Sequence, residues 1–302
     1  MEKSIKIIVT GCRGQLGCDL MSGLSPEYDV YGFDIGEVNI TRPDEVTAYM
    51  RQVHPRIVIH AAAMTDVDGC EKEPRSAMLI NGDGTANVAR ACSEIGARMI
   101  YYSTDYVFEG KARDKKPYTE DDQPAPLTVY GKSKLAGEKW TAEIMKDYLI
   151  LRIAWVYGRQ GKNFFKTMIN LGQGQIEKKN SGDKPPPLKV VNDQYGNPTW
   201  TGDIVLQTMR IMESDLTGIV HSTSSGVCSW YEFAREIFTG MNMAVDMEPC
   251  LTSEFPRPAP RPAWSALENR RLKENGLNLM RDWREALKQF MTELKDSEVN
   301  GM

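Results

Sequence analysis

The sequence has no CxxC pair, no cluster of cysteine with histidine, and no long apolar run. Its six cysteines are scattered, so neither a zinc site nor a thioredoxin-like motif is predicted, and we expect reduced thiols. No stretch approaches the ~18 apolar residues that a transmembrane helix needs. The first residues also lack the charged, apolar and cleavage regions of a signal peptide, so we expect a cytoplasmic protein without a membrane partner.

The chain also lacks a charge of one dominant sign. Its 37 basic and 41 acidic residues are mixed along the chain and give a formal net charge of −4. Without a basic stripe, the sequence predicts no nucleic-acid partner. Hydrophobic residues make up 41% and charged residues 26% of 302 residues, a balance typical of a globular protein whose core needs no disulfide support.

Short β-branched runs alternate with helical patterns over the first half of the chain. The runs predicted to be strands are residues 5–9, 29–34, 56–62, 98–104 and 148–154. This alternation indicates βαβ units, and right-handed crossovers put helices on both faces of a parallel sheet. The predicted fold class is therefore α/β, a doubly wound parallel sheet of the Rossmann type, with residues 1–155 as a dinucleotide-binding domain.

Beyond about residue 156 the alternation ends. Gly- and Pro-rich stretches such as LGQGQ (171–175) and KPPPL (184–188) interrupt the pattern and predict an irregular, loop-rich region. We interpret residues 156–302 as mainly a smaller, substrate-binding domain from which segments return to the Rossmann domain.

Capping residues predict several helix ends. Thr41 and Thr201 are candidate N-caps, Ser229 with Glu232 forms a predicted capping box, and Gly96 is a candidate C-cap. A last helix is predicted from about residue 282 to 294.

A glycine-rich turn, TGCRGQLG (10–17), follows the first predicted strand and opens a helix. Gly11, Gly14 and Gly17 are spaced GxxGxxG. Side chains here would block a pyrophosphate, so glycines let the backbone and the helix N-terminus approach negative charge. Incidental glycines in an ordinary turn can show the same spacing, but the strand-turn-helix context favours a dinucleotide site.

Two charged side chains near this turn favour different cofactors. Asp34 ends the second predicted strand, where a carboxylate can accept hydrogen bonds from the adenosine ribose and favours NADH. Arg13 lies inside the glycine turn and can neutralise the 2′-phosphate of NADPH, or it is a solvated loop charge. The sequence therefore predicts NADPH or NADH and leaves the preference open.

The segment VYGKSKLAGEKW (129–140) places Tyr130 and Lys134 four residues apart, on one face of a predicted helix. An ammonium about 4 Å away would stabilise tyrosinate by about 1–4 kcal/mol, enough to move the phenol pKa from about 10 towards neutral. A half-buried tyrosine near an exposed lysine would show the same spacing. The glycine turn upstream favours the interpretation as an acid or base.

The apolar segment YYSTDYVFEG (101–110) raises a related question, because it places Ser103, Thr104 and Asp105 at the end of a predicted strand. In a doubly wound sheet, ligands lie beyond the carboxyl ends of the strands. Thr104 can therefore hydrogen-bond a substrate oxygen while Tyr130 supplies a proton. For Ser103, capping of the following loop is an equally good interpretation.

Together these residues resemble the extended short-chain dehydrogenase/reductase family. The motifs that carry the resemblance span nearly the whole chain: GQLG (14–17), HAAAMTDVDGCE (60–71), STDYVFEG (103–110), YGKSKLAGE (130–138), RIAWVYG (152–158), NFFKTM (163–168), NDQYGNPT (192–199) and RPAPRPAWSAL (257–267). The narrower motifs are similar to the members that reduce the C4 ketone of dTDP-4-dehydro-L-rhamnose, which implies an NAD(P)H-dependent reductase.

Two alternatives stay open. One is a reductase of another 4-keto sugar nucleotide. The other is a cofactor-binding regulatory subunit, because the beta subunit of methionine adenosyltransferase resembles this family and keeps much of the same motif set. An intact set of motifs does not separate these possibilities.

The resemblance implies roles for matching positions. Tyr130 would be the proton donor, Lys134 its activator, and Thr104 the hydrogen-bonding partner of the C4 oxygen. With Tyr130 and Lys134, the implied cofactor contacts are Gly11, Gly14, Gln15, Leu16, Gly17, Asp34, Asn39, Ile40, Ala61, Ala62 and Ala63. The implied substrate contacts are Thr104, Asp105 and Trp155, with Arg257 or Arg261 clamping the diphosphate. A core aromatic is the alternative for Trp155.

Three positions qualify the resemblance. Asp105 is followed by Tyr106, where sugar nucleotide 4,6-dehydratases carry a glutamate, so simple ketone reduction is favoured. His60 stands where an asparagine is usual, and a lone histidine at a strand end is most often structural. Some members hold Mg²⁺ at a dimer contact through glutamates, but Asp19 stands at the matching position, so the sequence does not support a metal site. The implied partners are a small-molecule sugar nucleotide and, in a homodimer, a second copy of the chain.

Overall fold

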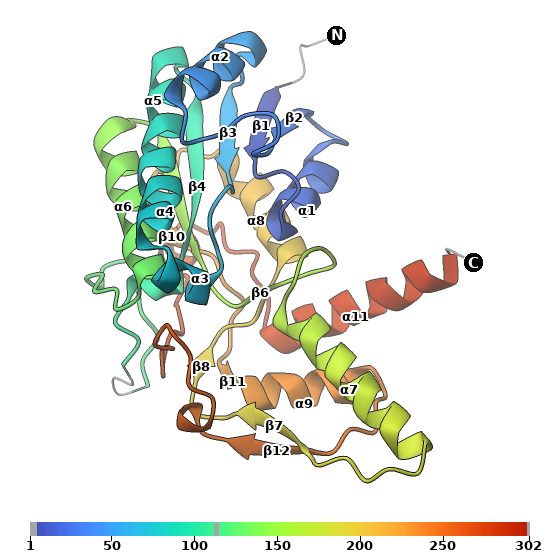
Figure 1. The fold of residues 1–302 in the computed structure, drawn as a ribbon. Helices are drawn as coiled ribbons and strands as arrows, with labels where there is room; N and C mark the ends of the chain where they lie inside the picture. The colour runs from blue at the N-terminus through green and yellow to red at the C-terminus, as the bar shows by residue number, and fades with distance from the viewer. Residues whose placement is uncertain (1–4, 112–114, 301–302) are drawn as a thin grey trace.

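The structure, a computed structural model, describes residues 5–111 and 115–300 (Figure 1). Its centre is a six-stranded parallel sheet with the strand order β10-β5-β4-β3-β1-β2. The strands are β1 (Lys6–Thr10), β2 (Asp29–Phe33), β3 (Ile57–His60), β4 (Arg98–Thr104), β5 (Tyr148–Ile153) and β10 (Gly218–His221). The doubly wound α/β class and the strands predicted in the first half are confirmed. β10 was not predicted, because a four-residue run inside an irregular region carries little pattern.

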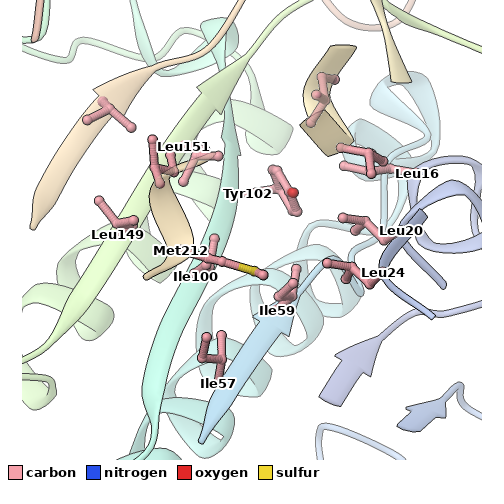
Figure 2. Packing of buried hydrophobic residues seen from close by; sticks show 14 of the residues in the cluster. Leu16, Leu20, Leu24, Ile57, Ile59, Ile100, Tyr102, Leu149, Leu151 and Met212 are labelled. Carbon is pink, nitrogen blue, oxygen red and sulfur yellow. The ribbon is translucent and has the colours of Figure 1, made fainter. Parts of the chain in front are cut away.

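Helices cover both faces of this sheet (Figure 1). One face carries α1 (Gln15–Leu24) and α8 (Thr201–Met212). The other carries α2 (Pro43–Val53), α5 (Thr85–Ile95) and α6 (Val129–Ile144). Side chains alternate between faces along a strand. Ile7 and Val9 therefore pack on α1, as Figure 2 shows for Leu16, Leu20 and Leu24 against neighbouring strands, while Ile8 packs on the opposite side.

A second group of elements follows β5. Its longer helices are α7 (Phe164–Asn180), α9 (Trp230–Gly240) and α11 (Trp283–Asn300), packed around buried aromatic rings and beside the parallel pair β7 (Leu188–Val191) and β12 (Met247–Cys250). The prediction that LGQGQ interrupts regular structure is wrong, because α7 runs through it. A Cβ at Gly172 would lie 2.8 Å from the Phe238 ring of α9, so glycine here serves helix packing.

The remaining elements are short. They are α3 (Val67–Lys72), α4 (Pro74–Ala77), the π-helical η1 (Met78–Gly84), the 3₁₀ turns η2 (Asp105–Val107) and η3 (Thr252–Glu254), α10 (Arg270–Glu274), and the two-residue strands β6 (Val156–Tyr157), β8 (Tyr195–Gly196), β9 (Thr199–Trp200) and β11 (Cys228–Ser229). No helix in the described parts of the chain is long and apolar enough to cross a membrane.

The predicted helix ends are partly confirmed. Gly96 caps α5 in the left-handed conformation, and Ser229 forms the capping box of α9 with Glu232. Thr41 is not an N-cap, because its hydroxyl donates to Asn39 Oδ1 and α2 begins at Pro43. Thr201 is not one either. Strand β9 runs directly into α8, which makes Thr201 its first helical residue, and α11 extends past residue 294 to Asn300.

Candidate functional site

A cleft of about 1510 Å³ lies over the carboxyl ends of the sheet strands. One side is formed by the glycine turn, the ends of β2 to β5 and the start of α6, and the other by β7 and loops of the second group of elements. Every residue predicted for cofactor, substrate or chemistry lines this cleft, while their individual roles stay predictions: Gly11, Gly14, Gln15, Leu16, Gly17, Asp34, Asn39, Ile40, Ala61, Ala62, Ala63, Thr104, Asp105, Tyr130, Lys134, Trp155, Arg257 and Arg261.

The glycine turn forms a cradle that only glycines allow. Gly11 has a φ of +66°, and a Cβ there would lie 2.7 Å from Ala62 Cα. A Cβ at Gly17 would lie 2.0 Å from the Gly11 carbonyl oxygen. Gly14 occupies the N-cap of α1 without a side-chain cap, so the first backbone amides of the helix face the cleft edge. These residues fit the pyrophosphate of a dinucleotide.

The loop after β3, where Ala61, Ala62 and Ala63 lie, is held by a chain of hydrogen bonds through His60. The Ala62 amide donates to Thr10 Oγ1 (3.1 Å), which bonds His60 Nδ1 (2.7 Å). On its other side, His60 Nε2 bonds Thr85 Oγ1 (3.1 Å). Because the Thr85 hydroxyl donates to a carbonyl, its oxygen accepts from Nε2–H, so Nδ1 accepts from Thr10. Burial lowers the His60 pKa to about 3, and the structural interpretation of His60 is confirmed.

Tyr130 and Lys134 lie on the first turns of α6, which begins behind the N-cap Thr128. Lys134 is 4% exposed, and burial lowers its pKa to about 7. Its Nζ lies 4.1 Å from the centre of the Tyr101 ring. Desolvation raises the pKa of Tyr130, although a hydrogen bond with the Thr104 side chain opposes this. The predicted lowering of the phenol pKa is therefore wrong, because burial outweighs this hydrogen bond and the nearby Asp105 carboxylate adds to the rise.

At the end of β4, Ser103, Thr104 and Asp105 make different contacts. Ser103 lines the cleft and donates to Glu138 on α6, a contact that the sequence did not predict. Thr104 Oγ1 accepts from the Tyr106 amide (3.2 Å) and donates to Asp105 Oδ1 (3.1 Å). Asp105 is 2% exposed, and its Oδ2 has no hydrogen-bond partner among the residues described. Burial raises the pKa of this carboxyl to about 6.

We expect Asp105→Asn to stabilise the protein above pH 6. A folded-state pKa near 6, above the value of about 3.9 for a free aspartate, means that the buried carboxylate costs stability at high pH. That cost is relieved as the pH falls from 6 towards 4. Urea unfolding at pH 8 should therefore show a gain of about 1–3 kcal/mol in the variant, shrinking towards zero near pH 4. Exposed Asp183→Asn is the matched control, and a loss of stability in D105N at pH 8 would contradict the expectation.

A pair of stacked tryptophans also lines the cleft. The Trp155 ring stacks on Trp230, with centroids 3.4 Å apart and planes 4° from parallel. Trp155 has a φ of 46°, which bulky residues seldom adopt, and a Cβ at Gly196 would lie 2.5 Å from its ring. Trp155 lines the cleft and also packs against the buried cluster that contains Phe108 and Trp264, so both interpretations of this residue stay open. Sequence reasoning missed Trp230, although the capping box at Ser229 places it in the first turn of α9 beside this site.

Arg257 and Arg261 converge on one carboxylate at the far end of the cleft. Arg261 donates to Asp68 Oδ2 at 2.8 Å, and Arg257 lies 3.8 Å from the same oxygen. Asp68 also accepts from the Ala259 amide (3.2 Å), which docks this loop on α3. Asp68 was not predicted as a site residue, because its partners lie almost two hundred residues away in the chain. No group of three or more His, Cys, Asp or Glu that could hold a metal occurs in the described residues.

Three features define the class of extended short-chain dehydrogenases/reductases. They are the glycine cradle after β1, the Tyr130 and Lys134 side chains on α6, and a cleft over the strand ends. The family model for the RmlD substrate binding domain matches residues 5–296, and the chain belongs to that family.

Comparisons with individual proteins support the same family. The chain is 40% identical over 289 residues to the spore coat polysaccharide biosynthesis protein SpsK of Bacillus subtilis, covering 95% of this chain and 97% of that protein. It is 35% identical over 305 residues to dTDP-4-dehydrorhamnose reductase of Escherichia coli, covering 96% and 98%. The crystal structure of dTDP-4-dehydrorhamnose reductase from Bacillus anthracis in complex with NADP matches with a TM-score of 0.90 and 41% identity, covering 96% of this chain and 99% of that one.

Proposed function

We propose that this protein reduces the C4 ketone of dTDP-4-dehydro-L-rhamnose to dTDP-L-rhamnose with NADPH or NADH. The relatives that carry this name match over nearly their full length, which supports the substrate. The observation that carries the proposal is the position of Thr104, Tyr130 and Lys134, which line one cleft together with the glycine cradle.

Each of these side chains has a definite part in the proposed reaction. The Thr104 hydroxyl, which donates to Asp105 Oδ1 when no substrate is bound, would turn to donate to the ketone oxygen and hold it next to Tyr130. Tyr130 gives its proton to the oxygen that forms at C4, and the raised pKa keeps the phenol protonated at neutral pH until that charge develops. Lys134, whose pKa is about 7, would activate Tyr130, because its ammonium form stabilises the tyrosinate that remains after proton transfer.

The cofactor supplies the hydride. Gly14, Gln15 and Leu16 would hold its pyrophosphate, Asn39 and Ile40 its adenine side, and the backbone from Ala61 to Ala63 its nicotinamide-side ribose. The His60 hydrogen-bond chain fixes this last segment.

The substrate occupies the remainder of the cleft. Asp105 Oδ2, which lacks a partner among the described residues, would accept from a sugar hydroxyl. Trp155 provides a flat surface for the sugar ring. Arg257 and Arg261 would bind the diphosphate. Asp68 then holds them in place while neutralising only one of their two charges.

We also assign residues 1–155 to a dinucleotide-binding domain and residues 156–302 mainly to a substrate-binding domain. Strand β10, which joins the central sheet beside β5, would be a segment that returns to the first domain. A homodimer and a cytoplasmic location remain part of the proposal, supported by the family resemblance and by relatives named as biosynthetic enzymes.

A spectrophotometric assay tests the proposed reaction. Adding dTDP-4-dehydro-L-rhamnose to the protein with NADPH or NADH should deplete the reduced cofactor and yield dTDP-L-rhamnose. Faster turnover of a different nucleotide or 4-keto sugar would move the substrate assignment within the same reaction class. No oxidation with any of these sugars, combined with a tight complex with a catalytic partner, would instead indicate a regulatory subunit.

A further inference from the structure

Three charged side chains meet beside the glycine turn, and one of them, Asp34, lines the cleft. Arg13 comes from the glycine turn, Asp34 follows β2, and Glu37 lies in the turn after it. The Arg13 guanidinium forms a two-pronged ion pair with Glu37, in which Nη1 lies 2.8 Å from Oε2 and Nη2 contacts Oε1. This geometry uses both terminal nitrogens of the guanidinium. Arg13 is therefore an exposed loop charge that is paired with Glu37 and is not turned towards a cofactor phosphate.

Backbone contacts join Asp34 to the same network. The Asp34 carboxylate accepts from the amides of Arg13 (3.2 Å) and Ile35 (2.8 Å), which fix its direction. Glu37 Oε2 also accepts from the Asp34 amide (3.1 Å). The hydrogen bond with Arg13 is the main cause that lowers the Glu37 pKa to about 2, so this group is a carboxylate at every working pH. The three side chains together carry a formal charge of −1.

This network distinguishes the two nicotinamide cofactors by charge. The 2′- and 3′-hydroxyls of NADH can donate to Asp34. NADPH instead places a phosphate there with a charge between about −1.5 and −2. Arg13 could bind that phosphate through the same two nitrogens only by leaving Glu37, after which two carboxylates would face the phosphate. Arg42, another cation that follows β2 in the sequence, is also paired with a carboxylate, because its Nη1 lies 2.8 Å from Glu45 Oε1.

We propose that Glu37 is a cofactor-specificity residue that holds Arg13 away from the 2′-phosphate and makes the protein bind NADH more tightly than NADPH. The inference rests on the proposed function only in requiring that the cleft binds a nicotinamide dinucleotide.

The test is direct binding of each reduced cofactor, without sugar substrate, followed by nicotinamide fluorescence. The intact protein should bind NADH about tenfold more tightly than NADPH, which corresponds to about 1.4 kcal/mol. Glu37→Gln removes one carboxylate and frees Arg13, so NADPH binding should tighten about tenfold while NADH binding changes less than about twofold. Adding Arg13→Gln to E37Q should then weaken NADPH binding again.

The chain offers a matched control. The pair Arg51 and Glu94 has side-chain exposures of 64% and 44%, against 63% and 44% for Arg13 and Glu37, and it joins α2 to α5, away from the glycine turn. Glu94→Gln should leave both affinities unchanged. Tighter binding of NADPH by the intact protein, or an unchanged ratio in E37Q, overturns the inference while leaving the proposed reduction intact. Failure to bind either cofactor would overturn both.

Discussion

Replacing Tyr130 with phenylalanine should lower kcat by about 10²–10⁴-fold, the usual contribution of a positioned acid, while the affinity for NADH or NADPH stays nearly unchanged. The change removes one hydroxyl and leaves the ring in place against Tyr106, whose ring centre lies 5.6 Å away. Without the phenolic proton, the charge that forms at the C4 oxygen loses its proton donor, although the Thr104 hydroxyl and Lys134 remain in the cleft. Steady-state turnover and a cofactor titration on the same preparation measure the two effects separately.

Tyr106→Phe is the matched comparison for this loss. Tyr106 presents a second phenol in the same cleft, at the edge of the Tyr130 ring. If any nearby phenol could supply the proton, the two variants would lose similar activity. We expect Tyr106→Phe to keep most of its turnover. A Tyr130→Phe enzyme with near-normal kcat would remove Tyr130 from the proton-donor role, whereas parallel losses of kcat and cofactor affinity would indicate a positional effect.

The sequence predicted those features that local pattern controls. Gly11 and Gly17 could be recognised because a turn between a strand and a helix leaves no space for a Cβ. The first strands followed from β-branched runs bounded by turns, and Gly96 and Ser229 followed from cap chemistry. The cleft lining was predicted because motifs at the carboxyl ends of parallel strands share one edge of the sheet.

Features that depend on distant partners were not predictable. Ser103 looked equally suited to a cap or a catalytic role until its contact with Glu138 became visible. Gly172 resembled a helix breaker, yet the Phe238 ring on α9 needs that space. The Tyr130 pKa followed the same rule, because charge spacing on a helix says nothing about how far the surrounding fold removes water from the phenol.

The pair Arg152 and Glu138 is such a distant contact, and it should give the largest stability effect in the chain. Arg152 is 1% exposed and donates to both Glu138 oxygens, at 2.9 Å and 2.7 Å, behind the cleft floor. Glu138→Gln leaves a buried guanidinium without its counter-charge. We expect a loss of about 3–5 kcal/mol in the free energy of unfolding, measured by urea titration.

A double variant separates charge from packing. Adding Arg152→Met to Glu138→Gln removes the uncompensated cation and should recover a large part of the loss, because an apolar replacement of a buried pair is often neutral or better. The exposed pair Arg270 and Glu274 provides the surface control, since Glu274→Gln should change stability by less than about 0.5 kcal/mol.

Glu138 also raises the pKa of Lys134, one turn away on α6. The single variant should therefore shift the pH profile of any remaining turnover to lower pH, and a loss of stability without that shift would show that the pair supports the fold but not the ammonium.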